Sequence, residues 1–178
     1  GESPLFEVCA VKRPVSAGRR VVHDYWQERA STFGLTLEGD SFEEWKAVIA
    51  AHLPAGRLRV LDAGTGTGFI AMVMAALGHD VTAVDLCSSM VEKARENAAR
   101  AGLSIRFLCT DAGELPFDDG VFDVVISRNV VWALPNPEEV LCQWRRVLRP
   151  GGLLMYFDGN HYYYLFSEQA RRDREAYI

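Results

Sequence analysis

The sequence has few cysteines and histidines, and none of them stands at a spacing typical of a metal site. The four cysteines are scattered without a C-x-x-C pair, and the four histidines include no H-E-x-x-H arrangement. Zinc and related metals are normally held by such closely spaced ligands. We therefore predict a protein without a metal site.

Long apolar runs and a strong excess of one charge are also missing. No stretch approaches the roughly 18 uninterrupted apolar residues of a membrane-spanning helix, and the N-terminal residues lack the apolar centre of a signal peptide. The chain carries 24 Asp and Glu residues against 19 Lys and Arg residues. This balance gives no support to a nucleic-acid-binding surface. The absences together predict a cytoplasmic protein with neither a membrane nor a nucleic acid as partner.

What the sequence does contain is the alternation of an α/β fold. With 178 residues, 49% of them hydrophobic, the chain is long enough to bury one sizeable core. From about residue 57 onward, short apolar runs alternate with segments of helical period, which is the pattern of strand-helix-strand units. We predict a Rossmann-like α/β fold, in which a mostly parallel sheet carries helices on both faces.

Turn residues divide this region into predicted elements. Strands are expected within residues 57–64, 79–86, 104–112, 121–129 and 153–160. Helices are expected at about 42–52, 69–78 and 88–101 and from Pro137 onward. The side chains expected to cap these helices are Ser41 with Glu44, Ser88 or Ser89, and Asn136.

Polar residues and glycines gather at the predicted carboxyl ends of the strands, where open parallel sheets bind ligands. In strand order they are Asp62 with Gly64, Gly66 and Gly68, then Asp85, then Asp111, then Ser127 with Arg128 and Asn129, and finally Asp158 with Asn160. A stable fold does not require so many polar residues and glycines at one edge of the sheet. We therefore predict one ligand site at this edge of the sheet.

The glycine-rich turn admits two kinds of cofactor. Gly66, Gly68 and Ala71 match the dinucleotide pattern G-x-G-x-x-A, and Asp85 lies close to the distance expected of a ribose-binding carboxylate. Asp62 favours a different ligand, because its carboxylate would repel a pyrophosphate but would attract the ammonium and sulfonium groups of S-adenosylmethionine. An NAD(P)-dependent oxidoreductase stays open as the alternative.

Four blocks of the sequence resemble the class I S-adenosylmethionine-dependent methyltransferases. They are VLDAGTGTGFIA, AVDLCSSMVEKARENA, CTDAGELPFDDGVFDVVISRN and WRRVLRPGGLLMYFD, in the order and at the distances usual in that family. The resemblance covers about residues 60–158. It implies an enzyme of the small-molecule type, which moves a methyl group from S-adenosylmethionine to an unidentified acceptor by direct displacement. A module that binds S-adenosylmethionine without catalysis is a further alternative.

The resemblance also implies which residues contact the cofactor. They are Asp62, Gly64, Gly66, Gly68, Asp85, Leu86, Met90, Asp111, Ala112 and Ser127. The first four would surround the methionine part, where glycine lets the backbone approach closely. Asp85 would accept both ribose hydroxyls. Leu86 and Met90 would pack on the adenine, and Asp111 with the backbone of Ala112 would bind the edge of this ring.

The acceptor side is less defined by the sequence. Candidate substrate-binding residues are Arg128, Asn129, Trp132 and Tyr162, and candidate catalytic residues are His161 and Asn129. The sequence does not identify a general base, and the reaction can proceed without one. The leaving group of a sulfonium is already activated, so positioning of the substrates supplies much of the acceleration.

The resemblance also suggests how the chain is organised. Residues 1–56 are predicted to form an N-terminal helical segment and cofactor lid, and residues 57–178 to form the methyltransferase core. The family usually adds two more strands after the fifth, which this sequence apparently lacks, so we expect the core to be C-terminally incomplete. The fifth strand would then be an uncovered edge, able to pair in a homodimer.

Overall fold

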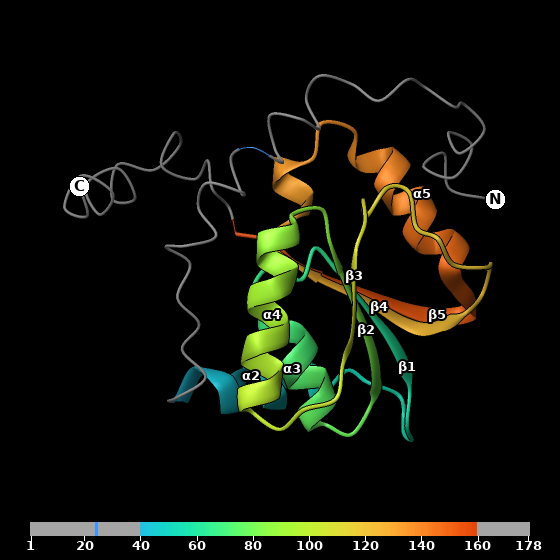
Figure 1. The fold of residues 1–178 in the computed structure, drawn as a ribbon. Coiled ribbons are helices and arrows are strands. Elements are labelled where there is room, and N and C mark those ends of the chain that lie inside the picture. The colour runs from blue at the N-terminus through green and yellow to red at the C-terminus, as the bar shows by residue number, and fades with distance from the viewer. Residues whose placement is uncertain (1–23, 25–39, 160–178) are drawn as a thin grey trace, which may run out of the picture.

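A five-stranded parallel sheet with the order β3-β2-β1-β4-β5 forms the centre of the protein (Figure 1). It is seen in a computed structural model, and the structure describes Asp24 and residues 40–159. The strands are β1 (Arg59–Ala63), β2 (Asp80–Asp85), β3 (Arg106–Cys109), β4 (Phe122–Arg128) and β5 (Leu148–Phe157). The predicted Rossmann-like α/β fold is confirmed.

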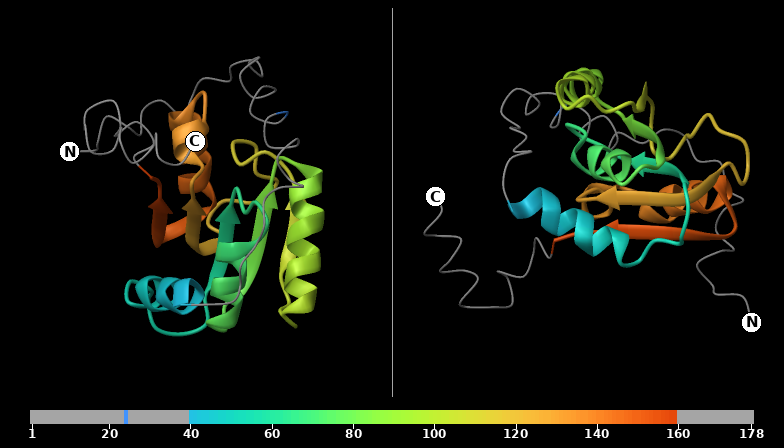
Figure 2. Two further views of the ribbon diagram at one scale, coloured as in Figure 1. Left: turned by 90° about the vertical axis from the view of Figure 1, so that its left-hand side faces the viewer. Right: turned by 90° about the horizontal axis from the view of Figure 1, so that it is seen from below.

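Helices cover both faces of the sheet, as Figures 1 and 2 show. On one face lie α2 (Asp40–Ala50), α3 (Phe69–Ala76) and α4 (Ser88–Arg100), and on the other lies α5 (Pro137–Val147). Successive residues of a strand point to opposite faces. Val60 therefore joins the core under α2, α3 and α4, whereas Leu61 joins the second core with Trp144 of α5.

The order of the strands sets the position of any ligand site. From β1 the chain first builds the sheet outward through β2 and β3, and then returns to place β4 and β5 on the other side of β1. Open α/β sheets bind ligands at such a reversal, outside the carboxyl ends of the strands. Since all five strands run in parallel, their carboxyl ends share one edge.

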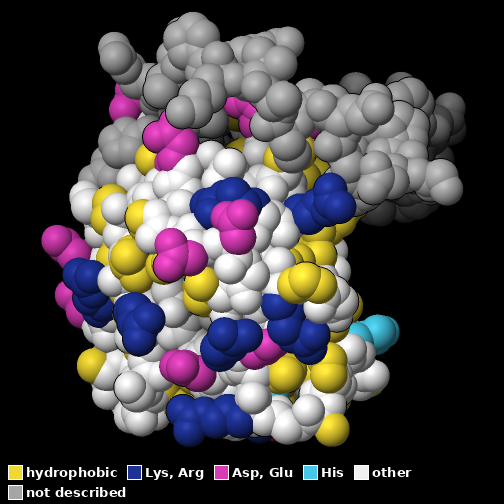
Figure 3. All heavy atoms as spheres, turned by 90° about the vertical axis from the view of Figure 1, so that its right-hand side faces the viewer, with side chains coloured by type: hydrophobic (Ala, Val, Ile, Leu, Met, Phe, Trp, Pro, Cys, Tyr) yellow, Lys and Arg dark blue, Asp and Glu magenta, His cyan; other side chains and the backbone are white. Residues whose placement is uncertain are grey.

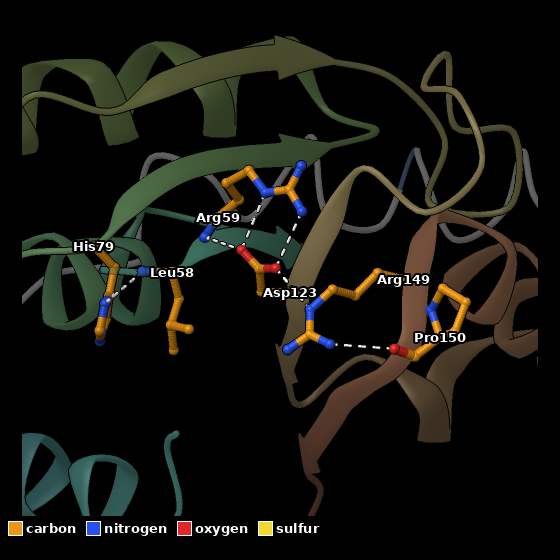
Figure 4. A network of polar contacts seen from close by, with 6 residues as sticks. All are labelled: Leu58, Arg59, His79, Asp123, Arg149 and Pro150. Atoms are coloured by element: carbon orange, nitrogen blue, oxygen red, sulfur yellow. Dashed lines mark hydrogen bonds and ion pairs between the residues drawn. The ribbon is translucent and has the colours of Figure 1, made fainter. Parts of the chain in front are cut away.

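The opposite edge of the sheet is held by an ion-pair network around Asp123 (Figure 4). Arg59 donates to its two carboxylate oxygens from Nε and Nη2 at 3.0 and 3.1 Å, and from its backbone N–H at 2.8 Å. Arg149 donates from Nε at 2.8 Å. These bonds, chiefly those from Arg59, hold the pKa of Asp123 well below its usual range. The network therefore ties β1, β4 and β5 together away from the predicted ligand site.

Two helices begin differently from the sequence prediction. The residue before α4 is Cys87, and the structure shows no capping hydrogen bond from its side chain. Its backbone N–H instead donates to Oδ1 of Asp85 at 2.9 Å. The prediction that Ser88 or Ser89 caps this helix is therefore wrong. α2 begins one residue before Ser41, which places Ser41 inside the helix instead of at its cap.

Charged side chains of both signs are interspersed on the face shown in Figure 3. Within the described residues, no helix is long and apolar enough to cross a membrane. No group of three or more His, Cys, Asp or Glu side chains in that part of the chain is placed to hold a metal ion. Most of the lid predicted for residues 1–56, and the candidates His161 and Tyr162, lie outside the described residues.

Candidate functional site

A cavity of about 300 Å³ lies at the carboxyl edge of the sheet, which is within the usual range for small-molecule sites. Eight of the predicted cofactor residues line it, namely Asp62, Gly64, Gly66, Asp85, Leu86, Met90, Asp111 and Ala112. Three predicted substrate residues also line it, namely Arg128, Asn129 and Trp132. The structure thus brings together residues from the ends of four strands.

Gly68 and Ser127 are not among the lining residues, and both have visible structural roles. Gly68 precedes α3 with φ +92°, and a Cβ there would lie 3.0 Å from the Cβ of Ala94 in α4. Its missing side chain lets the two helices approach. The buried hydroxyl of Ser127 donates to the carbonyl of Ala63 at 2.7 Å, which links β4 to β1.

The glycine turn after β1 presents backbone to the cavity. Gly64 and Gly66 have φ of +78° and +55°, in the left-handed region that favours glycine. A Cβ on Gly64 would lie 2.4 Å from Cγ2 of Val130, so no side chain fits between the turn and the loop after β4. A Cβ on Gly66 would meet no atom within 4 Å, so the turn is open at that position.

Asp85, the last residue of β2, organises two segments of the cavity wall. Its Oδ2 accepts the backbone N–H of Gly66 at 2.8 Å, and its Oδ1 accepts that of Cys87 at 2.9 Å. A carboxylate has about four acceptor positions. Two backbone donors fix this one in orientation while it faces the cavity.

Asp62 is a buried carboxyl in the middle of the site. The hydroxyl of Thr65 donates to its Oδ2 at 2.6 Å. Burial raises the pKa of Asp62 to about 7, against the hydrogen bonds from Thr65 and from the backbone of Ala71, and the charge of Asp85 adds to the rise while that of Arg128 opposes it. A positive ligand group placed here would stabilise the ionised form.

The far end of the cavity, beyond β2, is mostly apolar. Met90 is buried, and Leu86 and Ala112 also line the cavity. The carbonyl of Ala112 accepts the indole N–H of Trp144 at 3.2 Å, which ties this wall to α5. Oδ1 of Asp111 accepts the backbone N–H of Gly113 at 2.7 Å and so shapes the turn after β3.

The loop after β4 is held in place by the end of β5. Asn129, with φ +57°, donates its backbone N–H to the carbonyl of Phe157 at 2.8 Å. The two carboxylate oxygens of Asp158 accept the N–H groups of Val130 at 2.9 Å and Trp132 at 3.2 Å. Left-handed backbone is tolerated by asparagine. The predicted acceptor residues therefore sit on a braced loop, which includes the 3-10 helix η2 (Val131–Ala133).

The sequence prediction missed part of the lining. The missed residues are Thr65, Thr67, Phe69, Ile70, Val130, Ala133 and Leu134. The first four stand between or directly after the glycines of the turn, so their position in the motif was the available signal. The last three lie in the loop after β4, where the sequence shows only apolar residues without a motif.

Comparison with known proteins identifies the family. Residues 61–156 match the family model described as a methyltransferase domain. A ubiquinone biosynthesis O-methyltransferase from Roseobacter denitrificans is 37% identical over 110 residues, which cover 62% of this chain and 44% of that protein. A malonyl-(acyl-carrier protein) O-methyltransferase from Erwinia pyrifoliae is 41% identical over 103 residues, covering 58% of this chain and 38% of that protein.

A solved structure gives the same result for the fold. The phosphoethanolamine N-methyltransferase 1 of Haemonchus contortus, in complex with phosphoethanolamine and S-adenosylhomocysteine, matches with a TM-score of 0.66 and 25% identity, covering 80% of this chain and 33% of that chain. The matches span less than half the length of the two curated relatives. The family model covers more than half of this sequence, and the chain therefore belongs to the class I S-adenosylmethionine-dependent methyltransferase family.

Proposed function

We propose that this chain binds S-adenosylmethionine in the cavity and transfers its methyl group to a small-molecule acceptor. The order of chemical groups along the sheet edge carries the proposal. Asp111 and Ala112 follow β3, Asp85 ends β2, and Asp62 lies in β1. Because these strands are neighbours in the order β3-β2-β1, with about 4.8 Å between adjacent strands, the sequence of sites matches adenine, ribose and methionine in the ligand.

Each position offers the interaction that its part of the ligand needs. Leu86 and Met90 give an apolar surface for the adenine, and Asp85 has the acceptor oxygens for a ribose diol. Asp62 is a carboxyl for the ammonium group. At Gly66 the space that a side chain would take is open to the ligand. The residues present therefore fit this cofactor.

The position of Asp62 beside the glycine turn disfavours a dinucleotide cofactor. A pyrophosphate on the glycine turn would come close to Asp62, whose carboxyl is already raised in pKa by burial and by the charge of Asp85. A pyrophosphate there would disfavour the ionised form of Asp62 further, and the ionised carboxylate would repel the pyrophosphate. The oxidoreductase alternative is therefore the weaker proposal.

S-adenosylmethionine supplies an activated methyl group, so the chain's own contribution is to bind, orient and exclude water. The loop carrying Asn129, Trp132 and Leu134 forms the cavity wall after β4, and we assign it to the acceptor. Its apolar residues favour an acceptor with an apolar body. Two relatives named as O-methyltransferases support an oxygen as the methylated atom. We place the core of this activity in residues 57–178, with residues 1–56 as its lid.

Calorimetry with S-adenosylhomocysteine tests the proposal. We expect the wild type to bind in the micromolar range, and Asp85→Asn to bind about 10- to 100-fold more weakly, because charge-assisted hydrogen bonds to the ribose are lost. Asp80→Asn is the matched control, since it makes the same change at the exposed, opposite end of β2. Absence of heat with the wild type, together with a saturable change in reduced nicotinamide fluorescence, would favour the oxidoreductase instead. Binding without methylated product across a metabolite panel would indicate a non-catalytic module.

A further inference from the structure

Arg128 is a cation at the cavity for which the described residues provide no hydrogen-bonding partner. It is the last residue of β4, it is half-buried, and it lines the cavity. Within residues 40–159 the structure shows no hydrogen bond and no ion pair of its guanidinium group. A guanidinium carries five N–H donors, and removing them from water without an acceptor is unfavourable. The arrangement indicates a site prepared for an anion.

Two aromatic rings hold this guanidinium in place. Its Cζ lies 4.7 Å from the ring centroid of Phe69 and 5.0 Å from that of Trp45. Trp45 and Phe69 also contact each other edge to face, with centroids 6.5 Å apart. Stacking on ring faces orients an arginine and leaves the N–H groups at its edge available for a planar acceptor.

The neighbours of Arg128 show what kind of anion fits. Asp62 lies in the adjacent strand β1, and the charges of the two groups act on each other, although no hydrogen bond between them is formed. Phe69 and Ile70, the first residues of α3, line the same end of the cavity. The positive end of a helix dipole favours an anion there as well. One end of the cavity thus offers one acidic and one basic group side by side.

We propose that Arg128 binds the α-carboxylate of the methionine part of S-adenosylmethionine while Asp62 binds the adjacent ammonium. This assignment rests on the proposed function. It adds a carboxylate position at β4 to the adenine, ribose and ammonium positions at β3, β2 and β1, since β4 is the next strand in the sheet. An amino-acid end is a zwitterion and needs both charges within one end of the cavity. A planar carboxylate also suits the fork of a guanidinium. Arg128, predicted from sequence as a substrate-binding residue, is therefore assigned to the cofactor.

The test compares two ligands that differ in the amino-acid end. S-adenosylhomocysteine carries the carboxylate, and 5′-methylthioadenosine keeps the adenosine and the sulfur but lacks the whole amino-acid part. Calorimetry is run with the wild-type chain, Arg128→Gln and Arg128→Lys. Arg106→Gln is the matched control, because it removes the same charge from the exposed first residue of β3.

We expect Arg128→Gln to weaken S-adenosylhomocysteine binding about 10- to 100-fold, which is the range for the loss of charged hydrogen bonds. Methylthioadenosine binding should weaken less than about twofold, because this ligand has no carboxylate. Arg128→Lys keeps the charge but loses the fork, so its loss is expected to be smaller. Equal weakening of both ligands overturns the assignment, because it indicates a packing role beside Trp45 and Phe69. Unchanged S-adenosylhomocysteine binding also overturns it, and leaves the acceptor as the anion. A wild type that binds neither ligand overturns the proposed function itself.

Discussion

Replacing Asp62 by asparagine tests the buried charge at the centre of the site. In the folded protein the carboxyl is buried, and this raises its pKa to about 7. Hydrogen bonds from Thr65 and Ala71 and the charge of Arg128 favour the ionised form, whereas the charge of Asp85 disfavours it. Asparagine has the same shape and can still accept the bond from Thr65, but it does not titrate.

The expected magnitude follows from the two pKa values. In the unfolded chain the carboxyl titrates near its ordinary value of 3.8, and in the folded chain near 7. The folded state therefore binds the proton more tightly, so this contribution to stability is complete below about pH 4 and is lost as the pH rises to 7. Between pH 5 and pH 7 the free energy of unfolding should fall by about 2 kcal/mol through this group.

Urea unfolding at a series of pH values from 5 to 8 measures this difference. We expect the free energy of unfolding of the wild type, relative to Asp62→Asn, to fall by about 2 kcal/mol from pH 5 to pH 7 and then to level off. The exposed Asp80→Asn serves as control and should run parallel to the wild type. Parallel profiles for the wild type and Asp62→Asn would refute the reasoning.

The same group should make ligand binding depend on pH. An ammonium beside Asp62 stabilises the ionised carboxylate, so binding releases the proton that the free protein holds below pH 7. We expect the Kd for S-adenosylhomocysteine to decrease by up to about tenfold for each unit that the pH rises toward 7, and to become independent of pH above 7. Asp62→Asn should bind with a Kd that lacks this slope. A steep slope that survives the substitution would assign the proton to another group.

Three further predictions concern the glycine turn and the opposite edge of the sheet. Gly64→Ala should destabilise the ligand-free chain by about 1–3 kcal/mol, measured by urea unfolding, because its Cβ would clash with Val130. Gly66→Ala should destabilise the chain by about 1–2 kcal/mol, because alanine is strained at φ +55°, and should bind S-adenosylhomocysteine at least about tenfold more weakly, because its methyl group occupies ligand space; equal affinity would remove the turn from the site. Asp123→Asn should cost about 1–2 kcal/mol of stability at neutral pH and nothing in ligand affinity. Since the native pKa of Asp123 is depressed, that stability should decline progressively as the pH falls below about 4, and a loss that persists undiminished in acid would contradict the ion-pair account.

Local sequence patterns were sufficient to predict the fold and to select residues that line one cavity. Strand and helix periods depend on neighbours in sequence, so each predicted strand overlaps an observed one. The main difference is β5, which was expected from residue 153 and begins at Leu148, because the chain pairs with Phe122 as soon as α5 ends. That pairing joins residues far apart in sequence, which a local pattern does not encode.

Roles within the site depended on distant packing and were harder to predict. Nothing near Gly68 in the sequence indicates that Ala94 will pack against it, and nothing near Ser127 indicates a bond to Ala63. Cys87 is buried whereas Cys109 is exposed, a difference that the sequence around them does not indicate. Cys109 lies at the end of β3, an edge strand that pairs only with β2 in the described sheet.

The partnership of Arg128 with Trp45 and Phe69 could not be read from the sequence for the same reason. Trp45 lies on α2 and follows an ordinary apolar helical period, which predicts a core residue. Only the packing of α2 against α3 brings it to the end of β4. The sequence therefore placed Arg128 at the site but left its ligand open.

Asp62 and Arg128 share a feature that a stable core normally avoids. One is a buried carboxyl with a raised pKa, the other a half-buried guanidinium whose pKa is lowered by burial, and they do not neutralise each other by a hydrogen bond. A zwitterionic ligand satisfies both at once, and this gain contributes to a low Kd. Its binding should stabilise the fold by mass action, by about 2.7 kcal/mol at a ligand concentration of 100 times Kd. Local instability in the free chain is thus the physical counterpart of affinity for the cofactor.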